Sequence, residues 1–180
     1  MRMWGALALA LVAAVAAVAC VPLPAAAQML GSDAEACLAG EGPAVRVAVE
    51  GLKDRSGEIK VELYPANDDD FLKDDRDLIK EGKVFRRVRA PTPAWGPVIL
   101  CIRVPRPGRY ALLVTHNRDG RNKFNMWQDG AGLIGNVKLG RSRPKVAMAE
   151  IDVPAGIASA TVIVQYMRGL SGFGPVWPEK

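Results

Sequence analysis

Apolar side chains recur at every second position along most of this chain, and this alternation is its strongest structural constraint. Residues 45–50, 59–64 and 97–105 show it most clearly. In an extended strand successive side chains point to opposite faces, so each of these segments would have one buried and one exposed face. The alternation therefore predicts an all-β fold whose sheets turn one apolar face inward.

About seven segments have this period: 45–50, 59–64, 84–89, 97–105, 110–114, 146–153 and 161–166. We expect the first two to form a hairpin. The fourth and fifth, joined by a tight turn at 105–108, should form the centre of the core. The arginines of the third would discourage pairing with another chain, which predicts a sheet edge. Seven short strands separated by turns predict an antiparallel β-sandwich.

Residues 67–83 interrupt the alternation and predict at most one short helix. Four apolar residues have the spacing of one helix face: Phe71, Leu72, Leu78 and Ile79. Asp70 would cap this helix. The six aspartates of the segment alternate with lysine and arginine. This mixture indicates a solvent-exposed face and not a catalytic carboxylate pair.

Residues 1–27 are expected to be a signal peptide, because a cation at Arg2 precedes an apolar stretch that ends in small residues. Prolines interrupt the stretch before it reaches the roughly 20 residues of a membrane span. Cleavage after Ala27 would release the mature chain into the periplasm or the exterior, with no transmembrane span. The alternative is cleavage before Cys20, which would give a lipidated outer-membrane protein.

Cleavage after Ala27 would leave an even pair of cysteines, Cys37 and Cys101. In an oxidising compartment we expect them to form a disulfide, and two buried thiols are the alternative. A bridge closing a loop of about 65 residues could stabilise the fold by roughly 4 kcal/mol. The mature chain would then comprise an N-terminal arm (28–43), a sandwich domain (44–168) and a C-terminal tail (169–180).

The sequence has no catalytic or cofactor signature. Its 180 residues fit one domain, and it contains no Gly-x-Ser-x-Gly, His-Glu-x-x-His, Cys-x-x-Cys or phosphate-loop motif. Gly130, Gly132 and Gly135 have the Gly-x-Gly-x-x-Gly spacing, but the helix that dinucleotide binding requires after them is not predicted. We therefore expect a protein that is not an enzyme and has no cofactor.

Residues 107–111 read Pro-Gly-Arg-Tyr-Ala and are followed by His116 and a loop rich in Asn and Asp. Over about residues 45–167 this arrangement resembles a bacterial secreted family catalogued as domain of unknown function 2141. The resemblance implies a β-sandwich of the immunoglobulin or prealbumin type with a signal peptide, and no known activity. Asn117 and Asn125 stand where the family tends to have acidic residues, which makes this loop less suited to a cation.

Ten cations lie between residues 103 and 145, against two acids, Asp119 and Asp129. If the intervening loops meet at one end of the sandwich, they form a basic surface that attracts anions. The candidate binding residues are Arg118, Arg121, Lys123 and Trp127. In a bacterial envelope the partner would be an anionic glycan, a lipid head group or a protein, and nucleic acid is not expected. A basic surface without a dedicated partner is the competing interpretation.

A calcium-like site is the alternative for the same loop. Its oxygen ligands would come from Asn117, Asp119, Asn122 and Asn125. Only one of these is a carboxylate, so a turn in which Asn and Asp bond their own backbone competes with this interpretation. His116, the sole histidine, and Tyr110 are expected to have structural roles.

Overall fold

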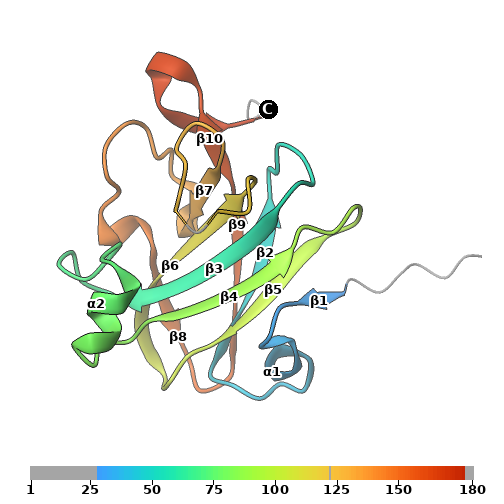
Figure 1. Cartoon of the computed structure of the whole chain (residues 1–180). Helices are drawn as coiled ribbons and strands as arrows, with labels where there is room; N and C mark the ends of the chain where they lie inside the picture. Colours follow the sequence, from blue (N-terminus) through green and yellow to red (C-terminus); the bar gives the residue numbers. More distant parts are fainter. Residues whose placement is uncertain (1–27, 122, 177–180) are drawn as a thin grey trace, which may run out of the picture.

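Two β-sheets share one core in the computed structural model, which describes residues 28–121 and 123–176 (Figure 1). The four-stranded sheet has the order β1 (Met29–Leu30), β5 (Val98–Arg103), β2 (Ala44–Glu50) and β9 (Ile157–Ile163). The seven-stranded sheet has the order β11 (Phe173–Pro175), β10 (Gln165–Met167), β7 (Gly130–Leu133), β6 (Gly108–Asn117), β3 (Glu58–Pro65) and β4 (Arg86–Pro91), and β8 (Glu150–Val153) also pairs with β6.

Helices contribute little to the described part of the chain. There are two short α-helices, α1 (Ala34–Leu38) and α2 (Asp75–Lys80), and three 3-10 turns, η1 (Ile134–Asn136), η2 (Val146–Met148) and η3 (Gly169–Ser171). Within residues 28–121 and 123–176, no helix is both long and apolar enough to cross a membrane. The predicted signal peptide (1–27) lies outside the described residues.

The prediction of a mostly β protein is confirmed, but the details differ. The described residues contain eleven strands and two α-helices, instead of seven strands and at most one helix. β9 runs parallel to β2, and β1 runs parallel to β5, so the four-stranded sheet is mixed. The additional strands are two to four residues long, which is too short for an alternation to be recognised.

The predicted alternation selected the buried faces correctly. Inward-facing side chains of β2 and β5 meet those of β3 and β6 in one cluster. Its largest fully buried members are Ile59, Leu63, Leu100, Ile102 and Leu112. Burying each such side chain contributes roughly 1.5–3 kcal/mol, so this cluster is the main source of stability.

The predicted hairpin of residues 45–50 and 59–64 is wrong. β2 pairs with β5 and β9, whereas β3 pairs with β4 and β6 in the other sheet. The turn at 105–108 likewise connects β5 in one sheet to β6 in the other. Alternation identifies the face that is buried but not the neighbouring strand, because both sheets bury the same kind of side chain. The expectation that residues 84–89 form an edge strand is confirmed for β4.

The chain also changes sheets at Val164, between β9 and β10. Here β7 approaches closely, and a Cβ at Gly130 would lie 2.4 Å from Val164 Cγ1. A Cβ at Gly132 would lie 2.6 Å from Val162 Cγ1. The first two glycines of the Gly-x-Gly-x-x-Gly spacing are therefore explained by packing between strands.

The predicted helix begins later than expected. Asp74, not Asp70, is the N-cap of α2, and its side chain accepts a hydrogen bond from the backbone N–H of Arg76. Asp70 instead pairs with Lys83 at 2.5 Å. Ile79, expected on the buried face, is 62 % exposed. A helix of six residues is too short for the i, i+7 spacing to define its face.

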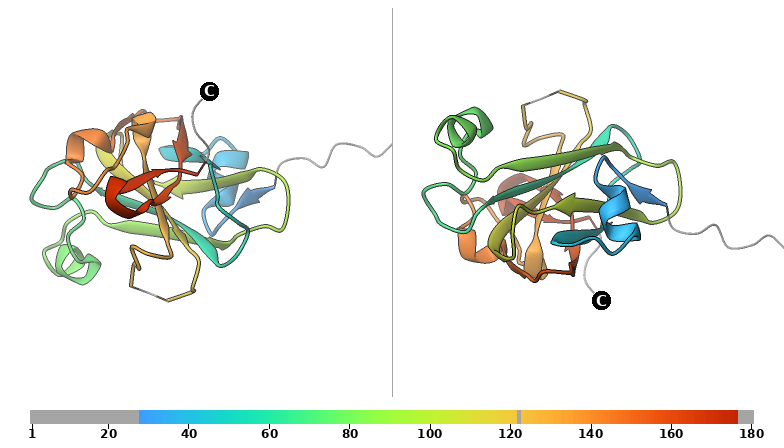
Figure 2. Two further views of the ribbon diagram at one scale, coloured as in Figure 1. Left: turned by 90° about the horizontal axis from the view of Figure 1, so that it is seen from above. Right: turned by 90° about the horizontal axis from the view of Figure 1, so that it is seen from below.

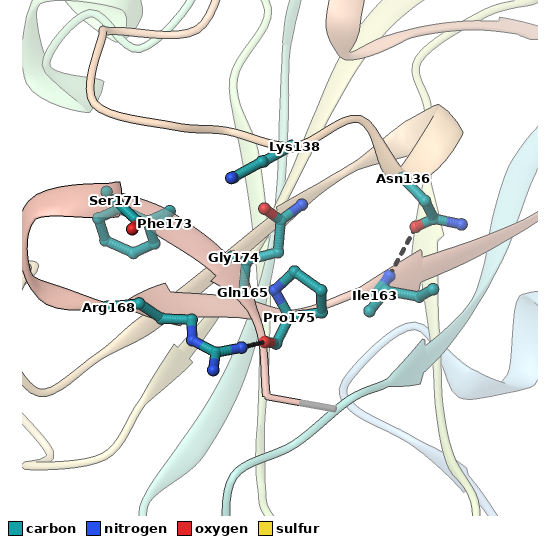
Figure 3. Close-up of a pocket in the computed structure, with 10 residues that line it drawn as sticks. Asn136, Lys138, Ile163, Gln165, Arg168, Ser171, Phe173, Gly174 and Pro175 are labelled. Atoms are coloured by element: carbon teal, nitrogen blue, oxygen red, sulfur yellow. Dashed lines mark hydrogen bonds between the residues drawn. The ribbon is translucent and has the colours of Figure 1, made fainter. Parts of the chain in front are cut away.

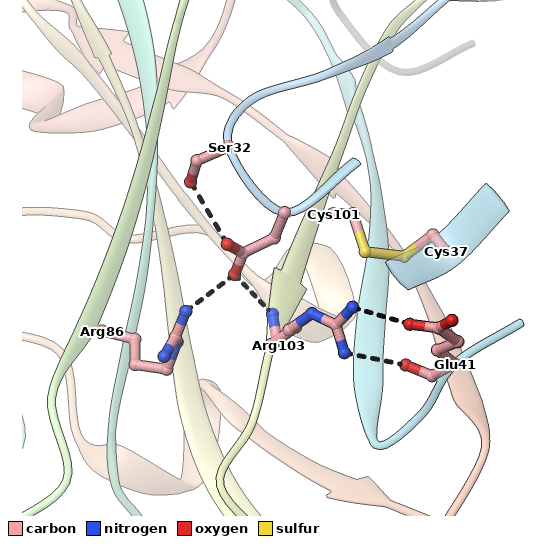
Figure 4. Close-up of a disulfide and its surroundings, with 7 residues drawn as sticks. Ser32, Cys37, Glu41, Arg86, Cys101 and Arg103 are labelled. Carbon is pink, nitrogen blue, oxygen red and sulfur yellow. Dashed lines mark hydrogen bonds and ion pairs between the residues drawn. A yellow bond between two sulfur atoms is a disulfide. The ribbon is translucent and has the colours of Figure 1, made fainter. Parts of the chain in front are cut away.

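The predicted N-terminal arm contains β1, which forms one edge of the four-stranded sheet, and α1, which covers the outer face of that sheet. A disulfide joins Cys37 of α1 to Cys101 of β5, with the two Cα atoms 6.0 Å apart (Figure 4). Beside it, the Asp33 carboxylate accepts hydrogen bonds from the backbone N–H of Arg103 (2.8 Å) and from the guanidinium of Arg86 (3.0 Å). The expected disulfide is confirmed, and it ties the arm to the sheet.

Replacing both Cys37 and Cys101 with alanine should lower the free energy of unfolding by about 4 kcal/mol, because the bridge joins two residues that are 64 positions apart in the chain. Urea unfolding of the oxidised protein and of the double variant measures the difference. Equal unfolding midpoints for the native protein with and without reductant would show that the bridge does not stabilise the fold.

Candidate functional site

The predicted basic surface is divided between two ends of the molecule. β6 is ten residues long, so Arg109 near its start lies about 30 Å from Arg118 beyond its end. Arg109 pairs with Asp152 at 2.9 Å. At the same end, Arg103 pairs with Glu41 at 3.0 Å. The sequence clusters these cations, but an extended strand separates them in space.

Arg118 is part of the framework of the loop at 118–129. Its guanidinium pairs with Asp54, and it also donates to the backbone carbonyl of Gln128 at 2.9 Å. This hydrogen bond from Arg118 holds the pKa of the Asp54 carboxyl far below its usual range. Arg118 is therefore already engaged, whereas Arg121, Lys123 and Trp127 are exposed.

Asp129 closes the same loop, and the sequence analysis did not single it out. Its side chain is 1 % exposed and accepts from the backbone N–H groups of Arg118 (2.9 Å) and Asn125 (2.8 Å). The sequence feature that could have identified Asp129 is its position as an acidic residue at the end of an Asn-rich segment. Because the buried carboxylate accepts hydrogen bonds from two backbone N–H groups of the loop, it gives the loop a defined shape.

The predicted cation ligands are used mainly within turns. Asp119 accepts from the backbone N–H of Arg121 at 2.9 Å, and Asn125 accepts from that of Trp127 at 3.1 Å. Asn117 donates to Glu58 at 2.9 Å. Asn122 lies outside the described residues. In the described part of the chain, no group of three or more His, Cys, Asp or Glu side chains could hold a metal ion.

His116 is fully buried and bonded at both ring nitrogens. Its Nε2 lies 2.7 Å from the carbonyl of Ser56, which can only accept, so this nitrogen carries the proton. Its Nδ1 then accepts from the hydroxyl of Tyr166 at 2.6 Å. The same hydroxyl accepts from the backbone N–H of Lys53 at 3.0 Å. Burial lowers the pKa of His116 and raises the pKa of Tyr166 to about 12.

Tyr110 packs in the shared core, and its hydroxyl donates to the carbonyl of Arg106 at 2.8 Å. This bond spans the turn by which the chain passes from β5 to β6. Tyr110 therefore links the corner between the two sheets to the core.

A groove of about 1300 Å³ lies across the outer face of the seven-stranded sheet. Its floor is formed by β3, β4, β6 and β7. Its walls are residues 72–76 before and within α2, residues 123–126 of the loop, and residues 139–144. α2 and the 118–129 loop project from the same side of the molecule (Figure 2, left). A second apolar cluster, which includes Phe71, Leu78 and Leu133, fills the α2 end of this face.

Charged side chains on the groove floor are buried and paired. Glu62 is 7 % exposed and accepts from Arg87 (2.5 Å) and from the Tyr64 hydroxyl (2.9 Å). Lys60 is 5 % exposed and lies 3.3 Å from Glu58. Buried charges are tolerated only when they are paired in this way, so the floor is a preformed polar surface.

The groove has more cations than acids. Eight lining residues are Lys or Arg and four are Asp or Glu. Six of the eight cations have a hydrogen-bond or ion-pair partner: Lys60, Lys73, Arg76, Arg87, Arg89 and Arg143. Lys123 and Arg141 are exposed and pair with no carboxylate among the described residues. The excess positive charge therefore lies on the groove walls.

A smaller cavity of about 450 Å³ lies between η1 and the β10–β11 hairpin (Figure 3). Its polar side chains bond to the surrounding backbone. Asn136 accepts from the N–H of Ile163 at 2.7 Å, and Arg168 donates to the carbonyl of Pro175 at 2.7 Å. Gln165 bridges two backbone groups of residues 137–139. These side chains are occupied by bonds that hold the cavity wall together, so the larger groove is the candidate site.

The predicted outward face of residues 59–64 supplies part of the groove floor. A family model described as an uncharacterised protein conserved in bacteria, DUF2141, matches residues 47–161. The chain belongs to this family. The resemblance inferred from residues 107–111 and His116 is thus confirmed. No match was found among curated proteins or among solved structures.

The stability of this DUF2141 protein should decrease as the pH falls from about 7.5 to 5.5. Burial lowers the pKa of His116, so below an unfolded pKa of about 6.5 the unfolded chain binds a proton that the folded chain does not. The loss should reach at most about 1.4 kcal/mol per pH unit. Urea unfolding across this range measures it.

His116 is the only histidine, so the His116→Gln variant should lose this pH dependence. An equally steep dependence in both proteins would assign the titration to another group.

Proposed function

We propose that this protein is an exported, non-catalytic module of the bacterial envelope that binds an anionic partner in the groove over the seven-stranded sheet. The observation that carries the proposal is the pair of exposed, unpaired cations, Lys123 and Arg141, on the walls of a groove whose other cations are engaged. Fixed cations around a concave surface concentrate anions there.

Export is supported by the disulfide, since such bonds persist in oxidising compartments. The proposed location is the periplasm or the exterior after cleavage behind Ala27, with residues 28–180 as the mature chain. Lipid attachment at Cys20 is the alternative processing route. In either case the groove would face the envelope space.

We assign the fold to the immunoglobulin- or prealbumin-like sandwiches. The support is the shared core of the two sheets and the bond from Tyr110 to the Arg106 carbonyl. A tyrosine that bonds backbone a few residues upstream at a corner between sheets is a recurring feature of such sandwiches.

A binding role, rather than catalysis, is favoured by the chemistry of the groove floor. Glu62 is engaged by Arg87 and Tyr64, and Lys60 is engaged by Glu58. General acid–base catalysis needs a titratable group that is free to exchange a proton with the substrate. These groups instead hold one another in place.

Exchanging Lys123 and Arg141 for glutamate should weaken binding of anionic probes about tenfold or more, equivalent to about 1.4 kcal/mol, because two charge-assisted contacts are lost. The probes are hexaglutamate, oligogalacturonate and phosphatidylglycerol vesicles, and titration calorimetry or co-sedimentation measures their binding. The matched control exchanges Arg46 and Arg106, which are exposed and lie outside the groove. Equal losses for both pairs, or no binding by any probe, would contradict the proposal.

The cation-binding alternative has one observation in its favour. Asn117 Oδ1 and Asp119 Oδ2 are buried and have no hydrogen-bond partner. Against a metal ion, the Lys60 ammonium already lies 3.3 Å from the carbonyl of Arg121 in the same loop. A buried ammonium at this position opposes a second cation.

Millimolar calcium should therefore leave the melting temperature unchanged. A ligand specific for the native state raises the melting temperature by mass action. A calcium-dependent rise, lost in the Asp119→Asn variant, would support the cation site instead.

A further inference from the structure

The Asn117 side chain has a fixed orientation at the end of β6. Its Nδ2 donates to a carboxylate oxygen of Glu58 at 2.9 Å. Because a carboxylate can only accept, the amide cannot be turned over. The Oδ1 atom must therefore point away from Glu58. The residue is 2 % exposed and lines the groove.

The Asn117 Oδ1 atom is a buried acceptor without a donor among the described residues. Burying a polar atom without a hydrogen bond is costly, so such an atom marks a place where a donor is expected. A simple anion has no proton to donate. A ligand that satisfies both this oxygen and the free cations must carry donor groups, such as hydroxyl, amine or amide N–H, in addition to negative charge.

The size of the groove favours a ligand of several units. Its volume of about 1300 Å³ exceeds the roughly 300–1,000 Å³ of sites for single small molecules. Its floor is also unsuited to an acyl chain, because Lys60, Glu62 and Asp129 lie beneath it. Covering those charges with hydrocarbon would be unfavourable.

A peptide is disfavoured by the strand pairing of the floor. β3 lies between β4 and β6, and β6 lies between β3 and β7. The backbone groups of β3 and β6 are used within the sheet, so a peptide main chain lying on either strand has no free groups to pair with. Recognition must therefore come from side chains.

An aromatic pair provides an apolar surface at one end of the groove. Phe124 and Phe173 stack with ring centroids 6.1 Å apart, and Phe124 is 44 % exposed. Met126, 47 % exposed, lines the groove beside it. A ligand with flat apolar faces between polar groups, such as a chain of sugar rings, matches this combination.

We propose that the groove binds an acidic oligosaccharide. A hydroxyl would donate to Asn117 Oδ1, the acidic groups would pair with Lys123 and Arg141, and a ring would pack on Phe124. This inference rests on the proposed anion-binding function and names its ligand class. Because Asn117 Oδ1 is covered, binding requires a neighbouring side chain of the groove to shift.

Calorimetry with three hexamers of different chemistry tests the ligand class. Oligogalacturonate has acids and hydroxyls, maltohexaose has hydroxyls alone, and hexaglutamate has acids without hydroxyls. We expect oligogalacturonate to bind at least tenfold more tightly than either of the others. A sulfated oligosaccharide of equal length then shows whether carboxylate or sulfate is preferred. The proposal is supported if oligogalacturonate or the sulfated oligosaccharide binds more tightly than both maltohexaose and hexaglutamate.

The Asn117→Leu variant tests the acceptor. It has a similar shape and removes the unpaired oxygen, so we expect oligogalacturonate to bind roughly five- to tenfold more weakly, as for the loss of one hydrogen bond. Gln128→Leu is the control, because Gln128 is an exposed amide of the adjacent loop that does not line the groove. It should bind as the native protein does.

A chemically modified ligand tests the same hydrogen bond on the native protein, in case the Asn117→Leu variant does not fold. Oligogalacturonate with its hydroxyls O-methylated keeps its carboxylates but cannot donate, and it should bind the native protein as weakly as hexaglutamate. Undiminished binding of the methylated ligand would overturn the hydroxyl contact while leaving anion binding intact, and equal binding of hexaglutamate and oligogalacturonate would overturn the choice of a sugar. Failure of every acidic ligand to bind would overturn the proposed function as well.

Discussion

The packing of two sheets against one shared core determines where a ligand could bind on this protein. Valine, leucine and isoleucine from β2 and β5 interlock with those from β3 and β6, which fixes the inner face of each sheet. The outer face of the four-stranded sheet is covered by α1, which the disulfide between Cys37 and Cys101 ties to β5. The outer face of the seven-stranded sheet keeps a large groove, because α2 and its apolar cluster cover just one end of it.

The polar side chains of that face have two different roles. Glu62, Arg87 and Lys60 compensate one another and form a rigid floor, whereas Lys123 and Arg141 remain uncompensated on the walls. Charges that pair with each other stabilise a surface without attracting a partner. The uncompensated ones determine which ligands approach, and this distinction is the basis of the proposed function.

Buried hydrogen bonds hold the loop at 118–129 beside the groove. Asp129 binds two backbone N–H groups of the loop, and Arg118 pairs with Asp54 across the end of the sheets. His116 and Tyr166 connect the same end to the backbone of residues 53–56. A wall held in this way needs little ordering when a ligand binds, which favours affinity.

The alternation of apolar residues by itself determined which face of each long strand is buried, and the two cysteines beyond residue 27, Cys37 and Cys101, allowed one bridge. The family was also recognisable from residues 107–111 and His116. Only the tertiary structure decided which strands are neighbours, that the cations on either side of β6 lie at opposite ends, and that β7 helps to form a groove. Burial depends on local periodicity, whereas strand pairing and the choice of free or paired charges depend on contacts between residues far apart in the chain.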